Sequence, residues 1–188
     1  MPRDPSESDS VRRHRHRAPR CVRCAVLTVS DTRSLENDPG GSLLAGLLEE
    51  AGHEVVSRSL VRDELELLRE QVRKLLTEPR VQVVLLTGGT GLAPRDVTPE
   101  AVAPLLERSL PGFGELFRWL SYQEIGSAAL LSRAFAGSRG DKLLFALPGS
   151  PAAIRTALEK LVLPELGHLV GEAGKGSPHR QGGPQERR

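Results

Sequence analysis

The sequence is poor in aromatic residues and has no long hydrophobic run, and each scarcity removes a class of protein. Phe, Trp and Tyr make up 3% of the 188 residues, so the stacking platforms of single-stranded nucleic-acid binders are missing. No apolar stretch approaches the roughly 20 residues of a transmembrane helix. Residues 1–20 lack the apolar centre of a secretory signal. We therefore expect a cytoplasmic protein that does not enter membranes.

Cysteine and histidine are scarce as well. Cys21 and Cys24 form one C-x-x-C pair, and none of the five histidines has a metal-binding spacing such as H-E-x-x-H. The pair opens an apolar run typical of a strand, on which side chains three positions apart point to opposite faces. Ordinary strand residues are favoured over a metal or redox pair, and catalysis through a histidine base finds no support.

The small positive net charge of +2 is unevenly distributed. Residues 1–20 carry six arginines against three acids, and residues 171–188 carry four basic residues against two acids, which leaves a net charge of −3 for residues 21–170. A nucleic-acid surface needs positive charge on a folded face. We therefore expect disordered basic tails at 1–20 and 171–188 around one domain at 21–170, and a tail-bound nucleic acid is the least favoured function.

Hydrophobic periodicity divides the predicted domain into alternating strands and helices. Strands are expected at 21–29, 53–61, 81–86 and 142–147; helices are expected at 42–50, 63–79, from 98 onward, at 116–121, 128–136 and 151–170, with Thr98 and Ser150 as helix caps and Pro164 as an interruption. This alternation predicts an α/β fold, a three-layer sandwich with a mostly parallel sheet. Ligands of such sheets bind at the carboxyl ends of the strands.

Polar and glycine residues follow each predicted strand, and the parallel sheet brings these junctions to one edge. They are Ser30 and Asp31 after the first strand, Asp63 after the second, residues 87–91 and Asp96 after the third, and Gly149 and Ser150 after the fourth.

The glycine-rich segment is Thr87, Gly88, Gly89, Thr90 and Gly91. Glycines let the main chain approach a ligand, and successive N–H groups can bind an anion such as phosphate. The segment lacks the lysine of the P-loop and the spacing of G-x-G-x-x-G. A tight connection without a ligand remains the alternative.

Three carboxylates, Asp31, Asp63 and Asp96, are expected at the same edge. Carboxylates suit a Mg²⁺ ion that bridges nucleotide phosphates. Each also has a structural alternative: Asp31 as a turn residue, Asp63 with Glu66 as a capping box, and Asp96 as a residue that fixes its own loop. Convergence favours a functional role for Asp63 and Asp96, and less so for Asp31.

The segment from Leu86 to Ala101, LTGGTGLAPRDVTPEA, resembles the signature of the MoaB and Mog proteins of molybdenum cofactor biosynthesis. Four further segments agree with it: TVSDTR at 28–33, PGFGELFR at 111–118, Ser132-Arg133-Ala134 with Gly137, and LPGSPAA at 147–153. The likeness spans about residues 24–168.

This resemblance implies a molybdopterin adenylyltransferase that joins AMP from ATP to the molybdopterin phosphate before molybdate insertion, with Mg²⁺ as the metal. By position, Gly88 to Gly91 would hold phosphate, and Asp63 and Asp96 would position metal and nucleotide. Ser132, Gly149 and Ser150 would line the pterin or phosphate pocket. Positioning and charge neutralisation dominate such phosphoryl chemistry, which fits the lack of a histidine nucleophile.

The resemblance also implies a homotrimer or hexamer. Phe113, Phe117 and Trp119 could supply contact surface, although packing in the core is favoured for them. The same family includes members without known catalysis, so a molybdopterin-binding or scaffold protein that does not consume ATP is the alternative function.

Overall fold

A six-stranded sheet forms the centre of the computed structural model, which describes residues 18–175. Its strands are β1 (Arg23–Val29), β2 (Glu54–Val61), β3 (Val83–Thr87), β4 (Arg108–Ser109), β5 (Phe135–Arg139) and β6 (Lys142–Leu147). The order across the sheet is β2-β1-β3-β6-β5-β4. The strands β2, β1, β3 and β6 run parallel, whereas β5 is antiparallel to both β6 and β4. The predicted, mostly parallel sheet is confirmed.

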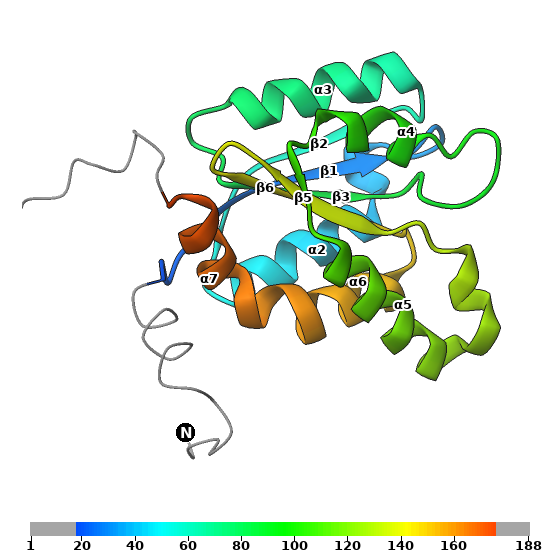
Figure 1. Ribbon diagram of the computed structural model, residues 1–188. Coiled ribbons are helices and arrows are strands. Elements are labelled where there is room, and N and C mark those ends of the chain that lie inside the picture. Colours follow the sequence, from blue (N-terminus) through cyan, green and yellow to red (C-terminus); the bar gives the residue numbers. More distant parts are fainter. Residues whose placement is uncertain (1–17, 176–188) are drawn as a thin grey trace, which may run out of the picture.

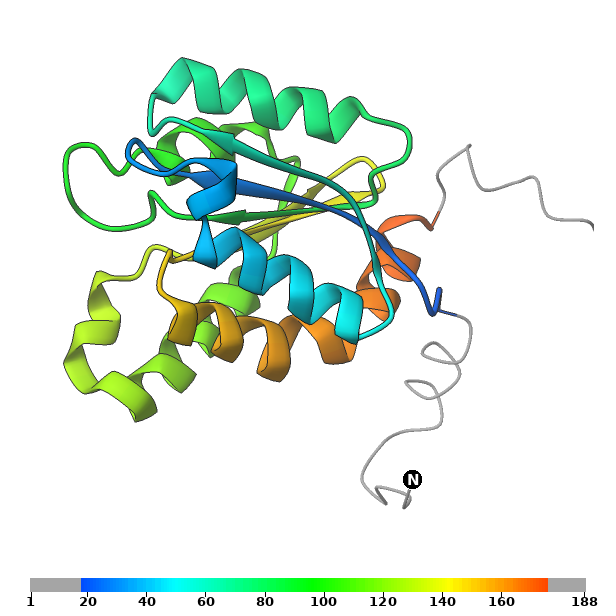
Figure 2. The same ribbon diagram turned by 180° about the vertical axis from the view of Figure 1, so that it is seen from behind.

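Helices cover both faces of this sheet, which gives the predicted three layers (Figures 1 and 2). They are α2 (Pro39–Glu50), α3 (Leu65–Thr77), α4 (Thr98–Val102), α5 (Pro111–Ile125), α6 (Pro151–Ala157) and α7 (Leu163–Ala173), with short turns η1 (Leu35–Asn37), η2 (Ala103–Leu105), η3 (Gly126–Leu131) and η4 (Leu158–Val162). In Figure 1, α3 and α4 lie above the sheet and the remaining α-helices lie below it.

Alternation along the strands produces two separate hydrophobic cores. Val83 and Leu85 of β3 face one core, together with Phe117 of α5, whereas Val84 and Leu86 face the other core. All four β3 side chains named here are fully buried. A central parallel strand needs apolar residues on both faces, which explains the uninterrupted hydrophobic run in the sequence.

The helix α3 buries the predicted apolar stripe, which includes Leu68, Val72 and Leu75. Its start differs from the prediction, because Glu64 occupies the N-cap position and no side chain caps the helix. The capping box of Asp63 with Glu66 is therefore wrong. The Asp63 carboxylate is free for other contacts.

The C-terminal helices begin as predicted. The backbone N–H of Ala153 donates to Ser150 Oγ at 3.2 Å, so Ser150 caps α6. A π-helical turn, η4, precedes Pro164, which has no N–H for a regular helical bond. The helix α7 then continues to Ala173, past the predicted end at Val170. Of the predicted tails, residues 1–17 and 176–188 lie outside the described residues.

The predicted helix at 128–136 is wrong at its C-terminal end. The helix α5 extends the prediction at 116–121 in both directions, and Gly126, with φ +63°, follows it. After the short turn η3, residues 135–139 form β5, paired with both β6 and β4. Pairing between strands outweighs the local helix preference of this Ala- and Leu-containing segment.

The two cysteines take no common role in the described fold. Cys24 is fully buried in β1, whereas Cys21 precedes the strand and is exposed, and both thiols are free. Burial, with a smaller contribution from Cys21, raises the pKa of the Cys24 thiol to about 12. A thiol of this pKa stays protonated and unreactive at neutral pH. Among residues 18–175, none of the helices combines the length and apolar character required to cross a bilayer.

Candidate functional site

A pocket of about 390 Å³ opens where β3 and β6 end, on the right-hand side of the molecule in Figure 1. Eight of the predicted site residues line it together: Gly88, Gly89, Thr90, Gly91, Asp96, Ser132, Gly149 and Ser150. They come from three separate segments of the chain. The expected meeting of strand ends therefore produces a concave site at this edge.

Three predicted binding residues lie outside the lining of this pocket. Thr87 is 1% exposed, and its hydroxyl donates to the backbone oxygen of Pro148 at 3.1 Å. Ser30 Oγ accepts from the N–H of Thr32 in its own turn. Asp31 links loops at the sheet edge, through the N–H of Asp63 and the guanidinium of Arg95. These three residues support the pocket's surroundings and do not face its interior.

The glycine loop leaves several backbone donors free. The N–H of Gly88 donates to Leu147 O at 3.0 Å, which joins the loop to β6. Within residues 18–175, no hydrogen bond uses the N–H of Gly89, Thr90 or Gly91. These consecutive residues line the pocket. Free successive N–H groups are suited to an anion.

Two glycines of the loop are required by the protein itself. Gly88 and Gly89 have φ values of +109° and +63°, a region that L residues rarely adopt. A Cβ on Gly89 would collide with Thr98 Oγ1 and lie 2.7 Å from Asp63 Oδ2. The missing side chain at Gly89 therefore makes room for the Asp63 carboxylate, in addition to any space for a ligand.

Asp63 holds its position through the backbone of the following loop. Its Oδ1 atom accepts from the N–H of Val97 at 3.2 Å. Burial raises the pKa of the Asp63 carboxyl, and the neighbouring Asp96 carboxylate adds to this rise, whereas the Val97 hydrogen bond opposes it. Asp63 is not among the residues that line the pocket, but its carboxylate lies against Gly89, which is; a raised pKa beside a cleft is a feature of functional carboxylates.

Asp96 packs against the opposite end of the glycine loop. Its Oδ2 atom accepts from Ala93 N–H at 2.9 Å, which confirms the structural alternative of a residue that fixes its own loop. A Cβ on Gly91 would lie 2.6 Å from the same oxygen. Asp96 also lines the pocket. The same side chain can therefore fix its own loop and take the predicted role in binding.

Asp31 joins three loops at the sheet edge. Its Oδ1 atom accepts from the N–H of Asp63 at 3.1 Å and lies 4.0 Å from Arg62 Nε. Its Oδ2 atom is in contact with the Arg95 guanidinium. The loops after β1, β2 and β3 are thereby connected. Asp31 has cationic partners on both oxygens, unlike Asp63 and Asp96.

Thr98 departs from its predicted role as a helix cap. Val97 occupies the N-cap position of α4, without a side-chain cap. The Thr98 hydroxyl instead donates to Gly88 O at 2.9 Å, and its N–H donates to Gly89 O at 3.0 Å. Thr98 therefore anchors the glycine loop to α4.

A further wall of the pocket was missed from the sequence. It consists of residues of α5, η3 and α6: Phe117, Ser121, Ile125, Ala128, Ala129, Leu131 and Ala153. Ile125 and Leu131 are 59% and 57% exposed. Two large apolar side chains left exposed beside a polar loop form an amphipathic pocket. The surplus of apolar residues at 116–131 was the available signal in the sequence.

The residues of the site offer oxygen ligands but no complete metal cage. Among residues 18–175, no cluster of three or more His, Cys, Asp or Glu side chains is placed to hold a metal. The two carboxylates, Asp63 and Asp96, lie against the same glycine loop. A hard cation held here would need its remaining ligands from substrate or water, which is the usual arrangement for Mg²⁺.

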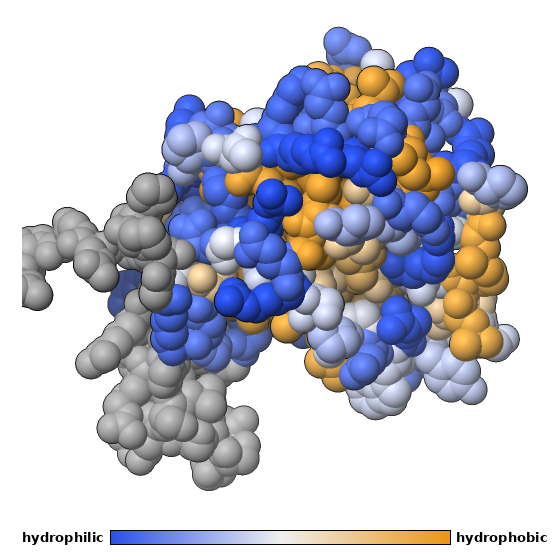
Figure 3. Space-filling model, turned by 45° about the horizontal axis from the view of Figure 1, so that its top comes forward, coloured by the Kyte–Doolittle hydropathy of each residue, from blue (hydrophilic) through white to orange (hydrophobic). Residues whose placement is uncertain are grey.

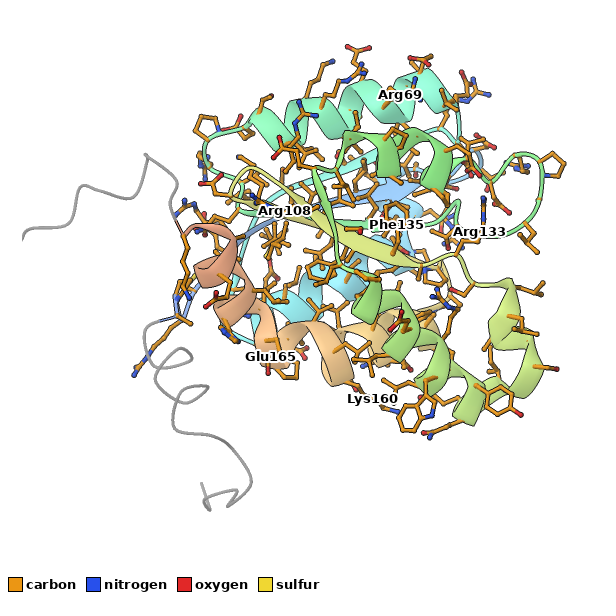
Figure 4. The ribbon with its side chains drawn as sticks, viewed as in Figure 1. Arg69, Arg108, Arg133, Phe135, Lys160 and Glu165 are labelled. Carbon is orange, nitrogen blue, oxygen red and sulfur yellow. The ribbon has the colours of Figure 1, made fainter. Side chains whose placement is uncertain are left out.

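A second hollow, of about 580 Å³, has a separate lining, to which Arg133 and Pro99 contribute. Leu106, Leu110 and Phe135 are among its lining residues, and the predicted site residues are not. Figure 3 shows hydrophobic surface in the middle of a mainly hydrophilic face, and Figure 4 places Phe135 and Arg108 centrally on the same side of the molecule. The predicted chemistry belongs to the first pocket.

Comparisons with known proteins match most of the chain. Residues 25–168 match the family model described as "Probable molybdopterin binding domain". The chain is 50% identical over 173 residues to the molybdenum cofactor biosynthesis protein B of Bacillus cereus, covering 92% of this chain and 99% of that protein.

Solved structures show the same likeness. A crystal structure of a molybdenum cofactor biosynthesis protein B aligns with a TM-score of 0.82 and 51% identity, covering 84% of this chain and 99% of the other. The structure of the molybdopterin biosynthesis enzyme MoaB from Thermus thermophilus aligns with a TM-score of 0.73 and 38% identity, covering 82% and 97%.

Proposed function

The chain belongs to the MoaB/Mog family of molybdenum cofactor biosynthesis proteins, and we propose that it binds molybdopterin at the glycine-loop pocket and adenylylates it with Mg-ATP. The coarser role, a part in molybdenum cofactor biosynthesis, rests on relatives matched over nearly their whole length. The observation that carries the finer proposal is the placement of Asp63 and Asp96 against a glycine loop with free N–H groups.

The pocket suits a flat heterocycle that carries a phosphate. Phe117, Ile125 and Leu131 offer apolar surface, and the loop of Gly89 to Gly91 offers amide donors in the same lining. A concave, partly apolar site with a few placed polar groups is the usual form of a small-molecule site. Ser132, Gly149 and Ser150 add polar groups to the same lining.

The proposed reaction transfers one group. An oxygen of the molybdopterin phosphate attacks the α-phosphorus of ATP, and the bond from that phosphorus to the oxygen bridging to the β-phosphate breaks. AMP becomes joined to molybdopterin and pyrophosphate leaves. The residues contribute chiefly by holding the two anionic substrates in place, which is the main need of phosphoryl transfer.

Mg²⁺ fits the donor set of this proposal. Asp63 and Asp96 each use one oxygen for a backbone N–H, from Val97 and Ala93 respectively. Their other oxygens accept no hydrogen bond within residues 18–175 and are hard ligands of the type that Mg²⁺ prefers. When bound, the ion would neutralise phosphate charge; Asp63 and Asp96 would hold it, and the free N–H groups would orient the phosphates.

A molybdopterin-binding protein without turnover remains the second candidate, since all three strand-end carboxylates already have structural contacts. One assay separates the candidates: purified protein is incubated with ATP, Mg²⁺ and molybdopterin, and pyrophosphate release is followed beside calorimetric binding of molybdopterin. We expect release that depends on all three components. Molybdopterin binding without pyrophosphate release would contradict the enzyme and support the binder.

We also propose a homo-oligomer, a trimer or hexamer. Phe113 and Phe117 pack in the core, 6% and 1% exposed, as was favoured. Trp119 differs, because it is 59% exposed, and Leu116 and Tyr122 on the same helix are exposed as well. Several large apolar side chains on one surface helix are typical of a protein contact.

A further inference from the structure

One arginine outside the predicted site spans the loop that carries Asp96. Arg133 lies just before β5, beside the loop at 91–96 (Figure 4). Its Nε donates to Gly91 O at 2.8 Å, and its Nη2 donates to Asp96 O at 2.6 Å. Its Nη1 contacts Glu100 of α4, and its backbone N–H donates to Thr90 O at 3.1 Å. The two ends of the loop are thus held by one guanidinium.

The loop between these ends has little else to fix it. Residues 92–95 are exposed, and Leu92, its large apolar side chain, is 65% exposed. Its remaining contacts are the internal bonds between Ala93 and Asp96 and the surface pair of Arg95 with Asp31. An exposed ion pair contributes little stability. The loop's shape therefore depends mainly on Arg133.

We propose that Arg133 is a positioning residue, which holds residues 91–96 so that the Asp96 carboxylate and the free N–H groups of the glycine loop face the pocket together. This inference rests on the proposed function for its kinetic readout. The planar guanidinium donates in several fixed directions, whereas a lysine ammonium is a single point on a flexible stem. Only a guanidinium can donate to Gly91 O, Asp96 O and Glu100 at once.

A role through charge alone is the competing explanation. Arg133 is paired with Glu100, so the pair brings almost no net charge to the site. Its side chain is 28% exposed, in keeping with a group held in place. Replacement of Arg133 by lysine separates the two explanations, because it keeps the positive charge and removes the several fixed donors of the guanidinium.

The test compares Arg133→Gln and Arg133→Lys with the matched control Arg139→Gln. Arg139, on β5, also donates to a backbone oxygen, that of Leu105, away from the pocket. Amide hydrogen exchange of residues 90–98 is measured together with melting temperature and with kcat and KM for Mg-ATP. We expect the hydrogen-bonded amides of this segment, those of Ala93, Asp96, Val97 and Thr98, to exchange on the order of tenfold faster in both Arg133 variants, with the rest of the fold unchanged.

The kinetic expectation is a fall in kcat/KM for Mg-ATP on the order of tenfold or more in both variants, with molybdopterin affinity changed by less than about threefold. The Arg139 variant should match wild type in both readouts. Normal exchange at 90–98 in Arg133→Gln, or wild-type behaviour of Arg133→Lys, would overturn the proposal. If Arg133→Gln does not fold, Arg133→Lys carries the same measurements. A wild type without turnover would defeat the proposed enzyme, whereas the exchange data would still decide the role of Arg133.

Discussion

The replacement Asp63→Asn separates the function of this carboxylate from its structural contact. Asparagine keeps an Oδ1 atom that can accept from Val97 N–H, the 3.2 Å bond of the native protein. It removes the charge that the proposed Mg-nucleotide complex needs. We expect turnover to fall by on the order of 10² or more, which corresponds to about 2.7 kcal/mol of activation free energy.

The thermal stability of Asp63→Asn should rise or stay unchanged while its turnover falls. Burial raises the pKa of Asp63 above its ordinary value, so the folded protein holds a proton on this group more tightly than the unfolded chain does. Ionised Asp63 therefore destabilises the fold, and this cost appears as pH rises through the folded-state pKa. Asp63→Asn should melt at or above the wild-type temperature at pH 7, and the difference should vanish at a pH below the unfolded-state pKa near 3.8.

The variant Asp63→Ala supplies the control for the hydrogen bond. It leaves Val97 N–H without an acceptor, which costs about 1–3 kcal/mol. In a domain of this size such a loss lowers the melting temperature by roughly 2–12 °C. Thermal unfolding at two pH values and pyrophosphate release measure both effects. The reasoning is refuted if Asp63→Asn loses as much stability as Asp63→Ala, or if its turnover survives.

Two further predictions concern the loop and the surface of α5. Gly89→Ala should lower the free energy of unfolding in urea by about 2 kcal/mol or more, because φ is +63° and the new methyl meets Thr98 and Asp63. The control Gly46→Ala, in the open part of α2, should raise it by about 0.5–1 kcal/mol. Equal changes in the free energy of unfolding for the two variants would contradict this explanation. Trp119→Ser should shift the sedimentation coefficient toward that of a monomer, whereas Leu67→Ser, at a 45% exposed site on α3, should not. An unchanged oligomer in Trp119→Ser would exclude Trp119 from the contact between subunits.

The parallel half of the fold could be predicted from the sequence because its signals are local. Three of the four parallel strands, β1, β3 and β6, are apolar runs followed by polar or glycine residues, β2 alternates only weakly, and Ser150 before Pro151 marks a helix start. The strand β5 could not be found in this way. Its residues, FAGSR, have no clear alternation, and their conformation depends on pairing with β4 and β6.

The candidate site, too, could be predicted where its signals are local and not where they depend on distant contacts. Strand-end residues such as Asp96 and Gly149 were found because a parallel sheet places them at one edge. The alternative role of Asp63 as a cap was wrong because Glu64 takes the N-cap position of α3, and Asp63 instead accepts from Val97 in a different loop. Arg133 gave no local signal, since its hydrogen bonds to Gly91 and Asp96 cross between distant segments.

The sheet divides the hydrophobic interior into two cores, and the apolar wall of the pocket and the anchor of Asp63 belong to different cores. Phe117 of the pocket lining packs in the core below the sheet, whereas α4, whose N-cap residue Val97 donates to Asp63, buries Ala101 and Val102 in the core above it. Side chains in separate packing units loosen independently to a first approximation. A substitution in one core can thus loosen the apolar wall of the pocket while Asp63 keeps its position, and a substitution in the other core can do the reverse.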